Sequence, residues 1–345
     1  MKKHIKLTAV ILLSVAAIAL LCSCTAPNTV STGTKYKLVL VIELFPAAEG
    51  VTSQEQAEFA LGDDTVSGCA WAALKEYRKK TYDDATTDKL AAIKYYTPAA
   101  AEGSDSVTYS SAFTTAAKKQ LELAASGGAE VIVLSNDDFS GAYLEIKDTT
   151  KTFGDVSFVI LTVPGSRVSE AASLNAKTTA VVFDARQYGY LFGYYAAEKG
   201  FKNVAYVGAD NAASKAFTEG LEKAAAAQGI SAKSVYTASG PVDSVINADI
   251  AKAAEGADLL IGDELTSSFI ASSGKKYASI YKDDKAEFCI TINASVITAK
   301  LADIINECRQ INAGTVRTLS AGDGIFVYSG SDALVEVPDF SASAE

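Results

Sequence analysis

Short apolar segments rich in valine, isoleucine and leucine alternate with longer amphipathic segments along most of this chain. Short apolar runs are typical of buried strands, whereas apolar positions three and four residues apart are typical of helices. The pattern predicts strands at 37–44, 91–96, 130–135, 157–163, 179–184, 204–208, 234–237, 258–263, 277–281 and 288–293. It predicts helices at 65–80, 111–125, 187–199, 214–228, 244–254 and 295–312. This alternation predicts an α/β fold of βαβ units with largely parallel sheets.

The length of the folded region predicts more than one lobe. From Lys35 onward the chain has about 310 residues, too many for one ordinary hydrophobic core. We therefore expect an N-terminal α/β lobe at 35–164 and a second α/β lobe at 165–285. Residues 286–345 would supply a crossover strand, a helix and a C-terminal segment that complete both lobes.

The N-terminus predicts export and lipid attachment. Three early lysines precede an apolar run at 7–21, and the sequence Leu-Cys-Ser-Cys then ends at Cys24. This order resembles a bacterial lipoprotein signal, which implies a signal peptide at 1–23 and a lipid on the Cys24 thiol. A transmembrane anchor is the alternative, but the run falls short of the roughly 20 residues that a spanning helix needs. The small polar residues of 24–34 would form a tether that places the protein at the extracytoplasmic face of a cell membrane.

Charge and residue content exclude several function classes. The chain has 31 basic and 41 acidic residues, and loss of the three signal lysines would leave a net charge of −13, which disfavours nucleic acid as a partner. The only histidine, His4, lies in the signal, so imidazole catalysis and His-based zinc sites are excluded from the mature protein. Cys69, Cys289 and Cys308 have no CxxC spacing and predict buried free thiols. We expect no cofactor, no metal and no enzymatic activity.

Four stretches in order resemble one protein family. They are the sequence GDDTVSGCAW at 62–71, the segment 183–197 with its FGYYAA run, VAYVG at 204–208 followed by Phe217 and Gly220, and GAD at 256–258 with the region 315–326. Together they are similar to the basic membrane proteins, the substrate-binding lipoproteins of ABC importers that include purine-nucleoside receptors. The resemblance implies a type I periplasmic-binding-protein fold with two Rossmann-like lobes joined by crossover strands. It also implies a nucleoside-like small ligand and an ABC permease as partner.

Candidate ligand contacts follow the predicted strands, because loops and helix N-termini converge at the carboxyl ends of parallel strands. Acids and amides suit the hydroxyl groups of a nucleoside or sugar, and aromatic rings stack on bases. The alternative is that these side chains only cap helices and form turns. The candidates are Asp63, Asp64, Asn136, Asp137, Phe139, Asp184, Asp210, Asn211, Phe217, Asp263 and Asp284.

The chain also departs from the family pattern. Val66 and Ser67 stand where relatives have Phe-Asn, and the aspartate that contacts ribose in relatives maps onto Asp283 or Asp284. These differences leave a second hypothesis, a surface lipoprotein with a sensory or adhesive role and a degenerate ligand site. A third is a carboxylate-based glycosidase, which needs two carboxyl groups about 5 to 10 Å apart. The aromatic run 188–195, with its two glycines, is expected to be a closely packed core helix.

Overall fold

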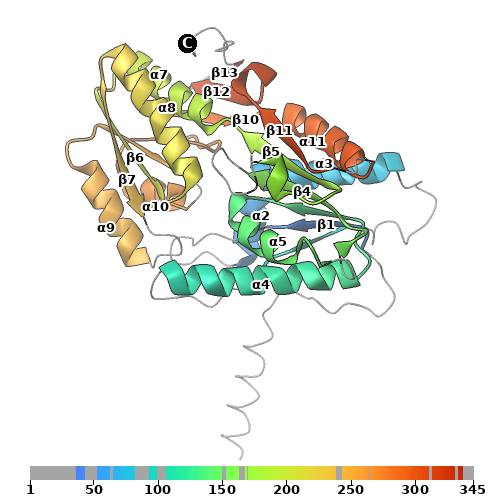
Figure 1. Ribbon diagram of the computed structural model, residues 1–345. Coiled ribbons are helices and arrows are strands. Elements are labelled where there is room, and N and C mark those ends of the chain that lie inside the picture. Colours follow the sequence, from blue (N-terminus) through green and yellow to red (C-terminus); the bar gives the residue numbers. More distant parts are fainter. Residues whose placement is uncertain are drawn as a thin grey trace, which may run out of the picture. The chain divides into compact units, whose positions relative to one another are not determined.

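The computed structural model of the protein describes residues 36–42, 53–62, 65–81, 93–98, 106–149, 153–162, 168, 170–237, 243–263, 265–310, 313–330 and 333–336. The segment from Lys35 onward forms one compact unit. Two sheets organise this unit, and both are mainly parallel (Figure 1). The signal and tether predicted at 1–34 lie outside the described residues.

The first sheet is entirely parallel, with strand order β11-β5-β4-β3-β1-β2. Its strands are β1 (Leu38–Val41), β2 (Ile93–Tyr96), β3 (Val131–Leu134), β4 (Ser157–Thr162), β5 (Thr178–Phe183) and β11 (Thr315–Leu319). Every residue of β1 and β3 is buried, because helices cover both faces of the sheet. Parallel strands that are buried on both faces have continuous apolar sequences, so β1 and β3 could be predicted from the sequence.

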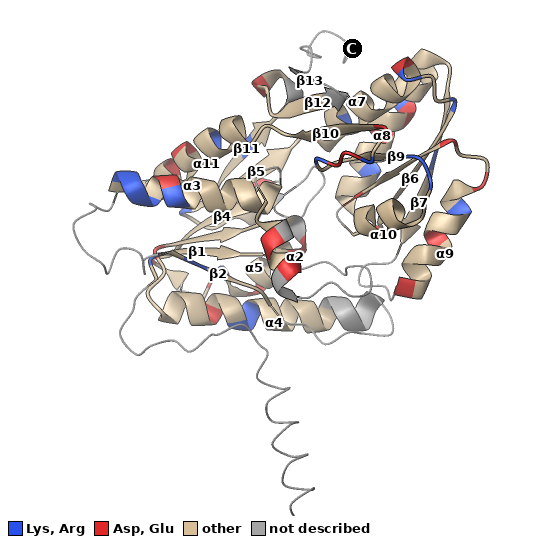
Figure 2. Cartoon of the chain, turned by 180° about the vertical axis from the view of Figure 1, so that it is seen from behind, with Lys and Arg blue, Asp and Glu red and all other residues tan. Residues whose placement is uncertain are grey.

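Helices α3 (Val66–Thr81) and α11 (Ala294–Cys308) pack side by side on one face of the first sheet, and α4 (Ser106–Ser126) and α5 (Ser140–Ile146) lie on the other (Figure 1). The short helix α2 (Ser53–Ala60) precedes α3. The basic residues at the end of α3 gather in its last turn (Figure 2), where Lys80 pairs with Glu76 at 2.8 Å. Cations in the last turn of a helix interact favourably with the helix dipole.

The second sheet has the order β13-β12-β10-β9-β8-β6-β7. Its strands are β6 (Asn203–Ala209), β7 (Ser231–Thr237), β8 (Leu259–Gly262), β9 (Tyr277–Ser279), β10 (Phe288–Ile292), β12 (Phe326–Gly330) and β13 (Ala333–Glu336). Only the β10–β12 and β12–β13 pairs are antiparallel. Helices α7 (Ala185–Glu198) and α8 (Ala212–Gln228) cover one face, while α9 (Asp243–Ala254) and α10 (Ser267–Ser272) cover the other.

Each predicted strand and helix overlaps an observed element, but the strand pairing differs from the expected division at β5. The boundary expected at 164 assigned this strand to the second lobe. In the structure β5 pairs in parallel with β4 on one side and with β11 on the other, so it belongs to the first sheet. The chain leaves the first sheet only after Phe183, where α7 begins.

Three segments connect the sheets, at 183–185, 292–294 and 319–326. The backbone N–H of Asp184 donates to the Leu319 carbonyl at 2.9 Å, and that of Asn293 donates to the Ile325 carbonyl at 2.8 Å. Asp184 and Asn293 also cap α7 and α11 with their side chains. The connections are thus hydrogen-bonded to one another, and the two caps fix where α7 and α11 begin.

The third connection contains a charged pair. Lys300 on α11 lies 2.7 Å from a carboxylate oxygen of Asp323, whose other oxygen accepts a bond from the backbone N–H of Ser320. Burial raises the pKa of Asp323, but the bonds from Lys300 and Ser320 outweigh it and hold the pKa below its usual range. The pair anchors this connection to α11.

Helices α7 and α8 meet backbone to backbone. A Cβ atom at Gly189 would lie 1.8 Å from the Phe217 carbonyl oxygen, and one at Gly220 would lie 1.8 Å from that of Arg186. Gly193 also faces α8, against Leu221 and Ala224. The predicted close packing of the aromatic run is therefore confirmed. The contact depends on glycine at these positions, because glycine has no side chain.

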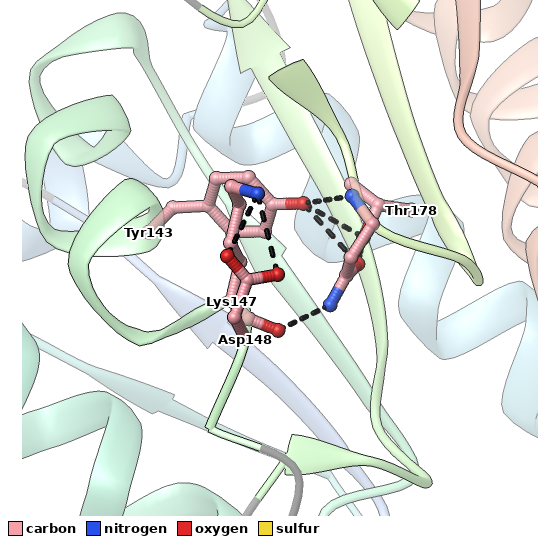
Figure 3. A network of polar contacts seen from close by, with 5 residues as sticks. Tyr143, Lys147, Asp148 and Thr178 are labelled. Atoms are coloured by element: carbon pink, nitrogen blue, oxygen red, sulfur yellow. Dashed lines mark hydrogen bonds and ion pairs between the residues drawn. The ribbon is translucent and has the colours of Figure 1, made fainter. Parts of the chain in front are cut away.

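A buried polar network holds the amino end of β5 (Figure 3). Tyr143 on α5 is fully buried, and its hydroxyl lies 3.1 Å from Thr178 Oγ1 and accepts the Asn175 backbone N–H at 3.0 Å. Asn175 Nδ2 in turn donates to the Lys147 carbonyl at 2.6 Å. The network joins α5 to the segment that enters β5.

Tyr143→Phe is expected to lower the free energy of unfolding by about 1–3 kcal/mol, because it removes the acceptor of the Asn175 backbone N–H and the hydrogen bond between the Tyr143 and Thr178 hydroxyls, although Thr178 still donates to Asn175 Oδ1. The ring itself remains packed against Phe158, so the core volume is unchanged. Urea unfolding of the variant and the wild type would measure the loss. A loss below about 0.5 kcal/mol would show that the hydroxyl contributes little.

One further prediction, on the cysteines, can be compared with the described residues. Cys69, Cys289 and Cys308 are buried thiols, as expected. The Cys308 thiol contacts the carbonyls of Phe158 and Lys177, and burial raises its pKa to about 11, so it stays protonated at neutral pH. Among the described helices, none is both long and apolar enough to cross a membrane.

Candidate functional site

A pocket of about 220 Å³ is lined by residues from both sheets. From the first sheet, Ser135 and Asn136 follow β3, Leu161 lies in β4 and Phe183 ends β5. From the second sheet, Ala209 ends β6, Gly262 ends β8 and Asp263 follows it, Ile280 follows β9 and Ile292 ends β10. The pocket therefore lies at the carboxyl ends of the parallel strands, where the topology places ligand sites in α/β folds.

Aromatic rings form much of the pocket wall. Tyr188 on α7 stacks on Phe326 with ring centroids 4.3 Å apart and contacts Phe217 edge to face at 5.7 Å. Tyr206 stacks on Phe217 at 4.8 Å. The Tyr188 hydroxyl donates to the Ile290 carbonyl at 2.5 Å, so the ring is fixed before any ligand arrives. Such a wall favours a flat, apolar ligand surface.

The first turn of α8 contributes polar groups to the pocket. Asn211 caps this helix by accepting the Ser214 backbone N–H at 2.9 Å, and the Ser214 Oγ atom lies 2.9 Å from the Tyr206 hydroxyl. Across the pocket, Asn136 Oδ1 accepts the Asp138 backbone N–H at 3.2 Å. Both amide oxygens are thus engaged with the backbone, which fixes the orientation of the two side chains.

Asp263, which follows β8, binds the end of β6 and the residue before α10. One carboxylate oxygen accepts the Ala209 backbone N–H at 2.6 Å, and the other accepts the backbone N–H and the hydroxyl of Thr266, both at 3.1 Å. Burial raises the pKa of Asp263, against the opposing effect of these hydrogen bonds. The side chain therefore connects the end of β6 to the start of α10 while it lines the pocket.

The structure brings four of the predicted ligand contacts into the pocket lining: Asn136, Asn211, Phe217 and Asp263. Asp63, Asp64 and the side chain of Asp137 lie outside the described residues, as does Cys24.

Four other predicted contacts are absent from the lining. Phe139 is fully buried against Phe113 in the core of the first sheet, and Asp184 caps α7 through the Gln187 N–H. Asp210 pairs with Lys215 at 2.6 Å, and Asp284 is exposed on the β9–β10 loop. The capping interpretation is thus correct for Asp184, and Phe139 is a core residue because its ring points into the sheet–helix interface.

The position expected to contact ribose also lies outside the pocket lining. Asp283 accepts a hydrogen bond from the Tyr277 hydroxyl at 2.5 Å, and its backbone contacts Cys289. The short β9–β10 loop is thus held by its own contacts. Val66, the first residue of α3, also lines the pocket.

Sequence reasoning missed several residues of the lining, most importantly Asp138, Tyr188, Tyr206, Ser214 and Phe326. Asp138 lies three residues after the predicted strand 130–135, next to the candidates Asn136 and Asp137, so its position alone could have indicated it. Tyr188 was expected to be a core residue, and it is packed in the core and lines the pocket as well. Among the described residues, no group of three His, Cys, Asp or Glu side chains could hold a metal ion.

Comparisons with known proteins identify the fold. No family model matches the chain, and no curated protein matches its sequence. An ABC transporter solute-binding protein from Conexibacter woesei DSM 14684 aligns over 88% of this chain and 92% of its own, with a TM-score of 0.50 and 16% identity. One from Aeropyrum pernix K1 aligns over 85% of this chain and 76% of its own, with a TM-score of 0.55 and 14% identity.

Regulators share the same architecture. A LacI family transcriptional regulator from Enterococcus faecium, solved with bound ribose, aligns over 87% of this chain and 98% of its own, with a TM-score of 0.52 and 12% identity. At such identities the likeness shows the fold and not the ligand. The chain therefore has the type I periplasmic-binding-protein fold, an α/β architecture found in solute-binding proteins of ABC transporters and in LacI-like regulators.

Proposed function

We propose that this chain is an extracytoplasmic, lipid-anchored solute-binding protein that delivers a small solute to an ABC importer. The observation that carries this proposal is the pocket itself, which is built from the carboxyl ends of strands in both sheets and walled by preordered aromatic rings. Ligand contacts from both sheets are what a hinged receptor needs in order to close on its solute. Cys24 would carry the lipid, and the permease would be the protein partner.

The solute we propose is a small ring-bearing molecule of the nucleoside type. Phe217 and the stacked Tyr188–Phe326 pair offer apolar faces to a base, and Asn136 and Asn211 offer amide groups to polar atoms. The proposal involves no chemistry on the solute. The acidic balance of the mature chain supports transport over the nucleic-acid binding of the LacI-like regulators.

A second candidate is a surface lipoprotein whose ligand site has degenerated. Two observations favour it: Val66 replaces an aromatic ring in the pocket, and neither Asp283 nor Asp284 lines the pocket. In this case the fold would serve a sensory or adhesive role without solute delivery.

A thermal-shift screen of the compact unit from Lys35 onward tests the two candidates. The panel would contain nucleosides, free bases, pentoses and hexoses. A ligand at 100 times its dissociation constant should add about 2.7 kcal/mol to the free energy of unfolding. This is enough to raise the melting temperature by about two degrees or more. A clear rise with one nucleoside supports the receptor and its proposed ligand class. A flat response across the panel would favour the degenerate site.

A further inference from the structure

The charges of the pocket lining are all of one sign. Among the lining residues that the structure describes, Asp138 and Asp263 are the only charged ones, and no lysine or arginine is present. Asp138 comes from the first sheet and Asp263 from the second, so negative charge lies on both sides of the pocket. Two cations in the first turns of the adjoining helices are engaged elsewhere, because Lys215 pairs with Asp210 and Arg186 pairs with Glu219.

Helix N-termini could in principle attract an anion to the same pocket. The first turns of α3, α7 and α8 contribute lining residues, and helix N-termini carry partial positive charge. In each of these turns a side-chain oxygen already accepts a backbone N–H. Thr65 accepts from Gly68, Asp184 accepts from Gln187, and Asn211 accepts from Ser214. The acceptor for α7 is itself a carboxylate, which offsets the helix dipole. The N-termini are therefore poor anion sites in this protein.

The apolar wall increases the effect of the two carboxylates. Charge–charge interactions are screened less among aromatic side chains than in water, so a bound anion would be repelled by Asp138 and Asp263. An anion would also lose its hydration without gaining a cationic partner, which is costly. A protonated amine would instead meet carboxylates and the faces of aromatic rings, both of which attract cations.

We propose that this pocket selects its solute by charge: it accepts neutral and cationic ring-bearing molecules and rejects anionic ones, with Asp138 as the residue that sets this selectivity. The inference rests on the proposed solute-binding function and adds the charge class of the solute. Asp263 contributes to the same field from a half-buried position, whereas Asp138 is exposed. Asp138 is therefore the carboxylate better placed to meet an incoming ligand.

Probes that share a ring system and differ in the charge of one substituent test the proposal. Tryptamine, tryptophol and indoleacetate share one ring system and are cationic, neutral and anionic at neutral pH, and adenosine with adenosine monophosphate forms a second, neutral and anionic set. Calorimetric titration of the full chain in mild detergent at low salt would give each dissociation constant. We expect the anion of each set to bind at least tenfold more weakly than its neutral counterpart. The difference should shrink at high salt, because salt screens exposed charges.

Three variants separate the role of Asp138 from a general effect of charge. Asp138→Asn should reduce the anion-to-neutral ratio of dissociation constants at least threefold, and Asp138→Glu should retain the wild-type ratio. The control Asp155→Asn removes an exposed acid that pairs with Lys177 outside the pocket, and should leave the ratio unchanged. Melting temperatures would verify that all three variants fold.

The possible outcomes lead to different conclusions. Equal binding of an anion and its neutral counterpart overturns the charge selectivity but leaves the solute-binding function standing. An unchanged ratio in Asp138→Asn overturns the assignment to Asp138. No binding by any of these probes, together with a flat thermal-shift screen, contradicts the proposed function and this inference together.

Discussion

Gly220→Ala is expected to destabilise the protein by about 3 kcal/mol or more, because it inserts a methyl group where two helix backbones touch. The added Cβ would lie 1.8 Å from the Arg186 carbonyl oxygen and 2.8 Å from the Tyr190 backbone nitrogen. Both of these atoms belong to the backbone of α7, so no side chain can rotate away. The helices would have to separate, and Tyr188 and Phe217, which they carry into the pocket, would move with them.

Urea unfolding followed by circular dichroism would measure this loss. Gly141→Ala is the matched control, because it also places a methyl group on a helix, but its nearest neighbour is the Thr114 side chain at 3.5 Å. That contact is an ordinary one, and alanine favours the helix by about 0.5–1 kcal/mol over glycine, so the control should be neutral or slightly stabilised. Similar free energies of unfolding for the two variants would contradict the close approach of α7 and α8.

This helix contact was predictable from the sequence, as was most of the fold. Gly189 and Gly193 are spaced four residues apart among aromatic residues, so both fall on one helix face and indicate a close neighbour. The strands β1, β3 and β8 were visible because burial on both faces makes them uniformly apolar. Sheet membership was harder to predict, because an apolar run such as β5 does not reveal which sheet it joins.

The candidate site was only partly predictable, because ligand contacts and helix caps share the same residue types. Asp184 and Asn211 both follow a strand and both cap a helix, yet only Asn211 also lines the pocket. Which way a strand-end side chain points depends on the loop geometry, and the sequence pattern does not encode that geometry. Tyr206 shows the same limit: it lies within a buried strand, but its ring lines the pocket.

Asp263→Ala is expected to lower the free energy of unfolding by about 3 kcal/mol, because it removes the side-chain acceptor of the Ala209 and Thr266 backbone N–H groups, whereas the Thr266 hydroxyl keeps the Val207 carbonyl as acceptor. The Ala209 N–H, at the end of a buried strand, would lose its partner. Asp263→Asn should lose less, about 1–2 kcal/mol, since the amide keeps one acceptor oxygen at similar volume but turns a donor toward the other N–H. Chemical denaturation at neutral pH would establish this order.

The pH dependence of the Asp263→Asn effect tests whether burial or hydrogen bonding dominates at this carboxyl group. Burial raises the pKa of Asp263 above its ordinary value of 3.8, so the folded state favours the protonated form. The stability that this group contributes is then complete below the unfolded-state pKa and is lost as the pH rises through the folded-state pKa. The asparagine variant lacks this titration, so the stability gap between wild type and variant should narrow as the pH rises from about 4 toward neutrality. A gap that widens over the same range would show that the hydrogen bonds from Ala209 and Thr266 outweigh burial and lower the pKa instead.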